Sequence, residues 1–285
     1  MPSLDEVLAE VDDWPVDTVG VGVSAADATS TTHGATDTVL PFASLTKPLS
    51  AYAVLIAVQD AAIHLDEPTG PEGAHEEITV RELLAHASGL PLETDGLVGA
   101  PRRRRIYSNW GYDLLGDLVA QRVGTSFADH LRFEVLGPLG MNRTVLEGSP
   151  AHAARGTVTD LLAFARELLA PQLLDEALHE AATTVAFPDL DGVVPGFGRQ
   201  YPCDWGLGFE VKSDKDPHWT GSELDARTYG HFGRSGSFFW VDPTRGIACA
   251  ELADRDFDQW SKDLWPGFND RVVEAASGDL DGGAA

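Results

Sequence analysis

The hydrophobic and polar residues of the chain switch between helical and strand-like spacing. Ser3 and Glu6 have the spacing of a capping box, and apolar residues follow them at helical intervals, so the sequence predicts a first helix there. Residues 16–23 show the alternation of a strand, and residues 28–33 can pair with them as a second strand. Residues 51–62 are apolar on every side, which is typical of a buried helix.

Helical spacing dominates residues 67–190, and strand-like spacing returns from about residue 195. The helices predicted in the middle of the chain cover residues 82–85, 112–122, 127–135, 160–169 and 173–181. The strands predicted after it cover residues 206–211, 228–232, 237–241 and 247–252. A last helix is predicted over residues 257–276 with an interruption at Pro266, and the tail 277–285 is expected to be loose.

Strands at both ends of the chain and helices between them predict an α/β (α+β) fold. The simplest arrangement is an antiparallel sheet built from both ends, flanked by the terminal helices, with an inserted and mostly helical region. We therefore expect residues 1–65 and 195–285 to form an α/β sheet domain and residues 66–194 to form a helical domain. The active site is expected between the two.

The charge of the chain is strongly negative. Its 285 residues include 45 acidic and 20 basic ones, which gives a formal net charge of −25. Such a surface repels nucleic-acid phosphates and anionic lipids, so neither nucleic acid nor a membrane is expected as a partner. The run Arg102–Arg105 is the exception, and it is predicted either to be neutralised by nearby carboxylates or to form an anion-attracting lip beside the active site.

Two further features concern the compartment of the protein. No apolar run approaches the ~20 residues of a membrane helix, and the first ten residues lack the basic and apolar regions of a signal peptide, so a cytoplasmic protein is expected. Cys203 and Cys249 are the two cysteines, and in such a compartment we expect them to be buried and free rather than bridged. The sequence gives no signal for an oligomeric state.

Ser44 and Lys47 stand three residues apart, directly before Pro48. This spacing puts both side chains on one helical face about a turn apart, so the amine can reach the hydroxyl. Because proline is tolerated in the first turn of a helix, Pro48 places Ser44 at or just before a helix start, where free N–H groups favour negative charge. The pattern suits a nucleophilic serine, although a capping serine beside a surface lysine would look the same.

Two other short elements carry candidate chemistry. Tyr107 and Asn109 precede a predicted helix and are either a packing ring and an N-cap, or a phenol near Lys47 whose pKa cationic neighbours lower. His231 and Gly233 end a predicted strand, where the glycine would let the backbone approach a bound ligand closely.

Together and in this order, these elements resemble the serine β-lactamase and penicillin-binding-protein superfamily, in its class C-like branch. That branch combines an S-x-x-K pair with a Y-x-N element and often an H-x-G element. The three elements lie here at residues 44–47, 107–109 and 231–233. The stretches LLAHASGLP at 83–91, YSNWGYDLLG at 107–116 and WGLGF at 205–209 are also similar to segments of the family, and the likeness runs from about residue 36 to about 255.

The resemblance implies a β-lactamase/transpeptidase-like fold and an acyl-enzyme mechanism without a metal or an organic cofactor. Ser44 would be the acylated nucleophile, and Lys47 and Tyr107 would share the proton that it gives up. The backbone N–H groups of Ser44 and Arg234 would form the oxyanion hole.

The resemblance also implies substrate-binding residues. Asn109 would hold Lys47 and contact the acyl side of the substrate, and His231 would line the sheet edge on the leaving-group side. Gly233 would keep the backbone close to the substrate. Phe232 stands where the family often has Thr, whose hydroxyl helps to hold a substrate carboxylate, and a phenyl ring offers no such donor.

The expected function is therefore a serine hydrolase that acts on a small ester or amide, most similar to an esterase. Activity of the β-lactamase or D-alanyl-D-alanine carboxypeptidase type uses the same mechanism and stays open as an alternative, and so does a non-catalytic binding protein of the family. Trp110, Trp205 and Trp240 flank the motifs and are expected either to wall an apolar acyl pocket or to pack in the core.

Overall fold

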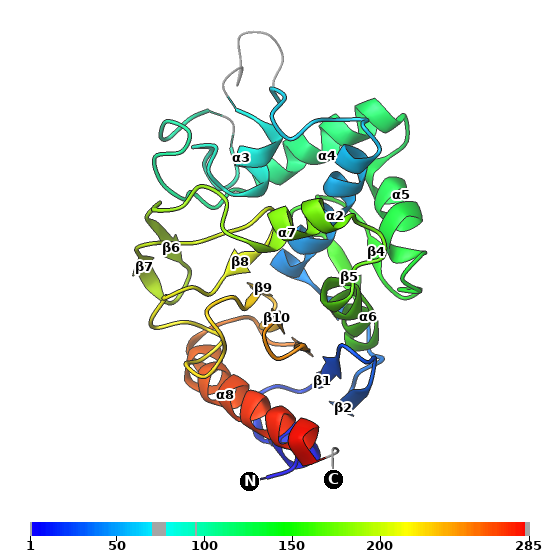
Figure 1. Cartoon of the computed structure of the whole chain (residues 1–285), viewed down its shortest axis with the longest axis vertical. Coiled ribbons are helices and arrows are strands. Elements are labelled where there is room, and N and C mark those ends of the chain that lie inside the picture. The colour runs from blue at the N-terminus through cyan, green and yellow to red at the C-terminus, as the bar shows by residue number, and fades with distance from the viewer. Residues whose placement is uncertain (1, 70–77, 95, 283–285) are drawn as a thin grey trace.

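A computed structural model describes residues 2–69, 78–94 and 96–282 of the chain (Figure 1). Within these ranges the centre is an antiparallel sheet of six strands in the order β2-β1-β11-β10-β9-β8. Its strands in chain order are β1 (Val19–Ala25), β2 (Ser30–Gly34), β8 (Glu210–Val211), β9 (Tyr229–Gly233), β10 (Ser237–Asp242) and β11 (Ile247–Ala253). Because β1 pairs with β11, the predicted sheet built from both ends of the chain is confirmed.

The two terminal helices cover one face of the sheet. Helix α1 (Leu4–Leu8), which begins with the predicted capping box, packs against α8 (Gln259–Gly282), and both chain ends lie on this side (Figure 1). Phe238 and Trp240 of β10 belong to the same apolar core as Trp265 of α8. The alternate residues of β10 point to the opposite face, as in any strand.

Helix α6 (Val158–Leu169) covers the opposite face, directly over β1 and β11. A Cβ atom at Gly22 of β1 would lie 2.6 Å from the Cδ1 atom of Leu162, so any larger residue there would force the Leu162 side chain to move. Phe239 and Val241 of β10 are part of the core on this face. The inner strands β10 and β11 are therefore buried on both sides, whereas the edge strand β2 is largely exposed.

The remaining helices surround α2 (Thr46–Gln59), which is buried along its residues Thr46–Ala57 and contacts α4 and α5. These helices are α3 (Val80–Leu84), α4 (Trp110–Val123), α5 (Phe127–Leu131) with a π-helical turn (Arg132–Leu136), and α7 (Glu176–Thr183). Helix α2 follows a 3₁₀ turn over Ala43–Leu45 and so begins in the middle of the molecule. A helix that is apolar all round needs such an interior position.

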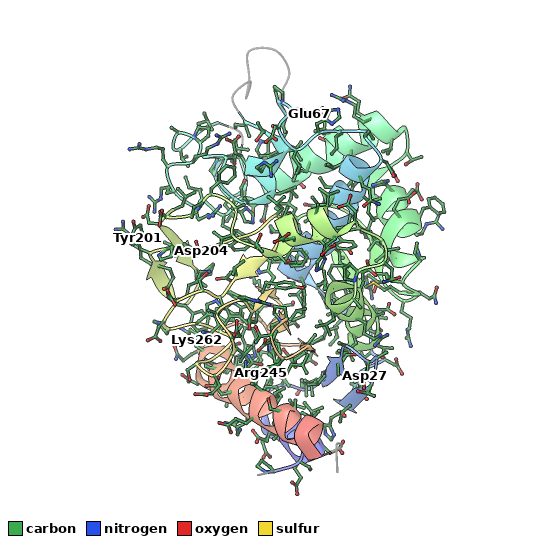
Figure 2. The ribbon with its side chains drawn as sticks, viewed as in Figure 1. Asp27, Glu67, Tyr201, Asp204, Arg245 and Lys262 are labelled. Atoms are coloured by element: carbon green, nitrogen blue, oxygen red, sulfur yellow. The ribbon has the colours of Figure 1, made fainter. Side chains whose placement is uncertain are left out.

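Several elements differ from the predicted ones. The strand predicted over residues 206–211 is reduced to β8, and the first strand begins at Val19 rather than at residue 16. Two small sheets were not predicted: β3 (Leu40–Pro41) with β4 (Val145–Leu146) and β5 (Ala154–Gly156), and a hairpin of β6 (Gly192–Val194) and β7 (Gly198–Gln200). Strands of two or three residues are too short for an alternating pattern. Tyr201, directly after β7, points outward from the molecule (Figure 2) and is 73% exposed.

The interruption predicted at Pro266 is wrong, because α8 continues through this residue. Trp265 and Phe268 on either side of it are fully buried, and this burial offsets the ~3 kcal/mol that an internal proline costs. The tail predicted to be loose is helical as far as Gly282, and residues 283–285 lie outside the described chain.

Three other expectations concern the chain as a whole. Helix α6, from the predicted helical domain, packs on the sheet, whereas α2, from the predicted sheet domain, packs among the helices. The domain boundaries themselves stay a prediction. Cys203 and Cys249 are free and buried, as expected. Among the described residues, no helix is both long enough and apolar enough to cross a membrane.

Glu251 lies at the centre of the sheet, opposite Val21 of β1 and Phe238 of β10. Its side chain is fully buried, and within the described chain neither carboxylate oxygen has a hydrogen-bond partner of normal geometry. Burial raises the pKa of Glu251 well above its ordinary value of 4.5, and the nearby backbone N–H of Phe238 opposes this only in part. The sheet therefore holds a protonated carboxylic acid.

Replacing Glu251 by Gln should stabilise the protein, and the gain should grow as the pH rises above 4.5. Above this pH the unfolded chain releases the Glu251 proton while the folded chain keeps it, so the natural protein loses up to about 1.4 kcal/mol of stability per pH unit. Urea unfolding at roughly pH 5, 6 and 7 measures the difference between the two proteins. Glu180→Gln, at an exposed position of α7, is the control. A gain from Glu251→Gln that stays constant with pH would contradict the assignment.

Candidate active site

Ser44 lies in the 3₁₀ turn that leads into α2. Ala43, directly before it, has a φ of 46°, a left-handed conformation that non-glycine residues seldom adopt. This conformation costs on the order of 1–2 kcal/mol for a residue other than glycine. It persists only where the surrounding structure stabilises it, often at functional sites. The turn is held by its contact with β9 on one side and by α2 on the other.

Gly233 is the residue of β9 that meets this turn. A Cβ atom at Gly233 would lie 2.6 Å from the carbonyl oxygen of Phe42 and 3.4 Å from the Cβ atom of Ala43. The third motif therefore needs glycine because the strand passes directly against the backbone before Ser44. Strand β8 pairs with β9 only at Tyr229 and Gly230, so the rest of this edge of β9 faces the turn.

Lys47 lies in the first turn of α2 and is fully buried. Its Nζ atom donates hydrogen bonds to Asn109 Oδ1 at 2.6 Å and to the carbonyl oxygen of Ala151 at 3.0 Å. Burial lowers the pKa of Lys47 to about 7, although the carboxylates of Glu93 and Asp113 oppose the change. A neutral amine has two N–H groups and one lone pair. Since the two oxygens take both N–H groups, the lone pair is left to accept a proton.

Asn109 precedes the first residue of α4, but its side chain does not cap the helix. Its Oδ1 atom accepts the bond from Lys47, and its Nδ2 atom donates to Oε1 of Glu93 at 2.6 Å. The interpretation of Asn109 as an ordinary N-cap is therefore wrong. Glu93 was missed in the sequence, where it is one acidic residue among many.

Tyr107 lies over Lys47, with the Nζ atom 4.4 Å from the centre of its ring. Its Oη atom is 3.0 Å from Nε2 of His231, and the side chain of Ser44 is close to it. Burial raises the pKa of Tyr107 above its ordinary value, and the nearby hydroxyl group of Ser44 opposes this rise only in part. The expectation that cationic neighbours lower this pKa is wrong, because burial raises it and the carboxylates of Glu210 and Glu93 raise it further.

The contacts of His231 fix which of its ring nitrogens carries the proton. Nδ1 accepts the backbone N–H of Phe232 at 2.8 Å, so Nε2 holds the hydrogen and donates it to Tyr107. Burial and, next, the nearby Lys47 lower the pKa of His231 to about 3, so the ring is neutral at physiological pH. Tyr107 thus accepts a bond from His231, and its own hydroxyl hydrogen is free to point at Ser44.

A second histidine, His86, supports Tyr107 from behind. Its ring centre is 4.4 Å from that of Tyr107 and 4.8 Å from that of Trp205, and its Nδ1 atom accepts the backbone N–H of Ser108. His86 has a left-handed backbone with a φ of 54°. His86 lies in the LLAHASGLP stretch, but that stretch alone did not indicate a role for it.

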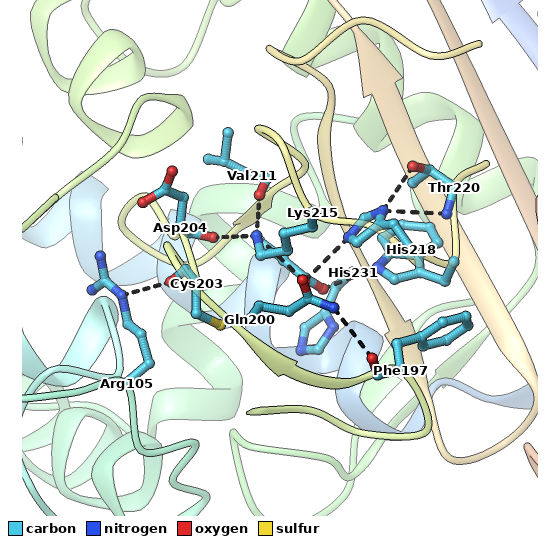
Figure 3. Close-up of polar contacts among 12 residues, drawn as sticks. Arg105, Phe197, Gln200, Cys203, Asp204, Val211, Lys215, His218, Thr220 and His231 are labelled. Atoms are coloured by element: carbon cyan, nitrogen blue, oxygen red, sulfur yellow. Dashed lines mark hydrogen bonds and ion pairs between the residues drawn. The ribbon is translucent and has the colours of Figure 1, made fainter. Parts of the chain in front are cut away.

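Glu210 of β8 was also missed, although it directly follows the WGLGF stretch. It is buried and accepts hydrogen bonds from Trp219 Nε1 at 2.9 Å and from His218 Nε2 at 3.2 Å, with Lys215 Nζ 3.5 Å away. Lys215 in turn donates to the carbonyl oxygens of Asp204 and Val211 (Figure 3). Burial alone would raise the pKa of Glu210, but Lys215 and the other donors lower it to about 2.

These groups meet around a cavity of about 510 Å³. Its polar lining is Ser44, Glu93, Tyr107, Asn109, His152, Glu210, His231 and Arg234. Its apolar lining is Ala43, Leu92, Val194, Pro195, Trp205, Phe232 and Phe257. The structure thus brings the predicted Ser44, Tyr107, Asn109, His231, Phe232 and Arg234 to one cavity, with Lys47 buried behind Tyr107 and Gly233 against the serine turn.

The tryptophans that flank the motifs divide between the two expected roles. Trp205 lines the cavity, whereas Trp240 is buried under α8 and donates to Asn269 Oδ1 at 2.9 Å. Trp110 packs against the core of the helical region without lining the cavity.

The arginine run does not form a lip of the cavity. Arg102 pairs with Glu82, and Arg104 lies 3.9 Å from Asp191. Arg105 is buried and donates to backbone carbonyl groups, including that of Cys203 at 3.0 Å (Figure 3). None of the four lines the cavity, so the alternative of an anion-attracting lip is wrong.

Comparison with known proteins identifies the family. A family model described as Beta-lactamase matches residues 7–268. The chain belongs to the β-lactamase family. It is accordingly a β-lactamase-family serine hydrolase, as the resemblance of its motifs implied.

Individual relatives differ in what their names describe. A β-lactamase from Mycobacterium bovis has a crystal structure with a TM-score of 0.91 and 44% sequence identity, covering 95% of this chain and 99% of that one. The D-amino acid amidase from Ochrobactrum anthropi SV3 shares the fold, with a TM-score of 0.77 and 22% identity over 97% of this chain and 98% of the amidase.

Penicillin-binding protein 4* of Bacillus subtilis (strain 168) is 28% identical over 138 residues, which are 38% of this chain and 31% of that protein. The D-alanyl-D-alanine-carboxypeptidase/endopeptidase AmpH of Escherichia coli (strain K12) is 27% identical over 157 residues, 44% of this chain and 41% of that protein. The chain thus matches less than half the length of these two curated relatives.

Proposed function

We propose that this β-lactamase-family protein hydrolyses small uncharged esters and amides through an acyl-enzyme, with the selectivity of an esterase. The observation that carries the proposal is the state of Lys47, a buried amine whose two N–H groups are taken and whose pKa is about 7. Such an amine is a proton acceptor at neutral pH, and it lies one helical turn from Ser44.

In the proposed acylation step, Ser44 Oγ attacks the carbonyl carbon of the substrate, and its proton passes to Lys47, directly or through Tyr107. A bond forms between Oγ and the carbonyl carbon, and the carbonyl oxygen becomes an oxyanion. The backbone N–H groups of Ser44 and Arg234 stabilise that oxyanion. The close approach of β9 to the serine turn supports this role, because Gly233 lets the strand pass directly against the turn.

Collapse of the intermediate breaks the bond to the leaving group, which takes a proton from the Lys47–Tyr107 pair. Tyr107 suits this role since it is a neutral phenol that accepts a hydrogen bond from His231. That bond stabilises any negative charge that develops on Oη. Water then attacks the acyl carbon and gives its proton to the Lys47–Tyr107 pair. The bond to Ser44 Oγ breaks, Oγ takes the proton back, and the acid is released.

The charges around the cavity favour an uncharged substrate. Glu93 and Glu210 both line it, and Phe232 replaces the Thr hydroxyl that would meet a substrate carboxylate. Arg234 is the one arginine of the lining, but its side chain is 87% exposed and lies 3.6 Å from Asp256. Since Lys215 compensates the charge of Glu210, a carboxylate in this cavity would meet the like charge of Glu93 and one solvated partner.

Activity of the β-lactamase or D-alanyl-D-alanine carboxypeptidase type is the second candidate. It is favoured by the names of the relatives and by the place of Arg234 at the cavity. A non-catalytic binding protein is the third candidate, and the complete set of Ser44, Lys47, Tyr107 and Asn109 around one cavity argues against it.

A fluorophosphonate should label Ser44 alone among the serines, and Ser44→Ala should lower ester hydrolysis by at least ~10³-fold, because the nucleophile is lost. Peptide mass spectrometry locates the label, and release of p-nitrophenol from p-nitrophenyl butyrate gives the rate. Ser235→Ala is the matched control and should keep both properties. Label on Ser235 in the natural protein would refute the assignment of the nucleophile.

The kcat/KM for a neutral ester should rise as the pH increases through about 7, since Lys47 accepts the serine proton only after losing its own. Asn109→Asp puts a carboxylate beside Nζ, which raises the pKa of Lys47 and should move the rising limb to higher pH by about one unit or more. Asp117→Asn, at an exposed site on α4, should leave the midpoint in place. A midpoint unmoved in Asn109→Asp would show that another group sets it.

Phe232→Thr should shift selectivity from esters toward β-lactams. Restoring one charge-assisted hydrogen bond to a substrate carboxylate is worth on the order of 1.5–3 kcal/mol, roughly ten- to a hundred-fold in the ratio of the two kcat/KM values. The measurement compares p-nitrophenyl butyrate with a cephalosporin for both proteins. If the natural protein hydrolyses the cephalosporin with a kcat/KM equal to or above that for the ester, the second candidate is supported instead.

A further inference from the structure

We infer that the cavity contains an apolar subsite for the leaving group, formed by Phe232, Phe257, Val194 and Pro195, and that it selects esters of aromatic alcohols. The inference deepens the proposed function and depends on it. Its starting point is that these four residues come from three separate parts of the chain and line the same cavity as Ser44.

The position of Phe232 assigns this wall to the leaving group. In the proposed mechanism the Lys47–Tyr107 pair returns the proton to the departing oxygen, and Tyr107 is hydrogen-bonded to His231, so the leaving group lies beside Tyr107 and His231. The ring of Phe232, the next residue of β9, has its centre 6.1 Å from that of His231, and Phe232 also lines the cavity. Asn109, which is assigned to the acyl side of the substrate, forms hydrogen bonds with Lys47 and Glu93 instead.

Phe257 extends the wall from the segment that follows β11. Its ring centre lies 5.0 Å from that of Phe232 and 5.3 Å from that of Trp265. Its backbone N–H donates to the carbonyl oxygen of Arg234 at 2.8 Å, which ties this segment to the end of β9. The second ring is thus fixed against the first by a backbone hydrogen bond as well as by packing.

The hairpin of β6 and β7 closes the wall with Val194 and Pro195. A Cβ atom at Gly196, in its turn, would lie 2.7 Å from Cζ of Phe257, so the hairpin is packed directly on that ring. Phe197 joins the same cluster, with its ring centre 6.2 Å from that of Phe232. The bare backbone at Gly196 is what allows this contact.

Buried polar side chains hold the hairpin from behind. Gln200 Nε2 donates to the carbonyl oxygens of Phe197 at 3.2 Å and Pro217 at 3.1 Å (Figure 3). Lys215 joins the neighbouring segment by donating to the carbonyl oxygen of Asp204, and Figure 3 shows the bonds of both side chains. A wall fixed in this way needs no rearrangement to bind a ring, which preserves affinity.

The chemistry of the wall fits an uncharged aromatic group. None of the four side chains is charged, and Glu210, the buried carboxylate of the cavity lining, is already compensated by Lys215. Two phenyl rings 5.0 Å apart at an angle of 42° offer a tilted partner to a third ring. A benzyl group placed there buries far more apolar area than an ethyl group does.

The test compares benzyl butyrate with ethyl butyrate, whose alcohols leave with similar intrinsic ease, so the ratio of kcat/KM reports contact with the leaving group. The natural protein should prefer the benzyl ester by at least ~10-fold. Phe257→Ala should lower this preference by about 10-fold, and Phe257→Leu, which keeps an apolar side chain and guards against misfolding, by less. Phe133→Ala, at a 56% exposed ring outside the cavity, is the control and should keep the ratio.

Ethyl phenylacetate distinguishes the two sides of the substrate, because it carries its ring on the acyl group. If Phe257→Ala weakens hydrolysis of this ester and leaves the benzyl preference intact, the wall binds the acyl group and the inference is overturned. Hydrolysis of benzyl and ethyl butyrate at equal kcat/KM overturns it too, while the serine-hydrolase proposal stands. Absence of ester hydrolysis together with absence of a label on Ser44 would overturn both.

Discussion

The burial of one amine, that of Lys47, is the constraint on which the rest of the site depends. An ammonium group in this position would lose its hydration, so the folded protein favours the neutral amine and the pKa falls to about 7. The burial is a consequence of the fold, because α2 runs through the centre of the molecule between the sheet and the other helices. Asn109 and the carbonyl oxygen of Ala151 then satisfy the two N–H groups. A central helix thus produces a proton acceptor without any nearby charge being required.

The second constraint is the close approach of β9 to the serine turn. Gly233 removes the Cβ atom that would meet the carbonyl oxygen of Phe42, and Ala43 takes up a left-handed backbone to complete the contact. The strand then places His231 within hydrogen-bond distance of Tyr107. The strained backbone at Ala43 and the absence of a side chain at Gly233 therefore both allow groups that are far apart in sequence to lie around one cavity. The packing of α2 and β10 against the same region provides the stability that holds this strain.

The sequence predicted the parts of the site whose signal is local. Ser44 and Lys47 are a turn apart on one helix, and the sheet with its terminal helices follows from alternating patterns that are long enough to read. Glu210 and Phe257 could not be predicted, because each reaches the cavity through long-range packing. The β6–β7 hairpin has strands of only three residues, which leave no periodicity. The pKa of Tyr107 was expected to fall because proximity to a cation is visible in a motif, whereas the degree of burial, which raises it, depends on the whole fold.

Burial does not act on every charge of this protein in the same way, and the difference bears on what the cavity accepts. Glu210 and Glu251 are both buried in the sheet, yet the pKa of Glu210 falls to about 2 and that of Glu251 rises. Glu210 has Lys215 and hydrogen-bond donors beside it, whereas Glu251 has no partner of normal geometry in the described chain. Around the cavity, Tyr107 and His231 are neutral, Lys47 is close to neutrality, and Glu210 is compensated. An uncharged ester enters such a site without leaving any charge unpaired, while an anionic substrate would have to find its counter-charge on the solvated side chain of Arg234. The selectivity proposed for this protein therefore follows from how its interior charges are buried and paired, and Phe232 is one part of that arrangement.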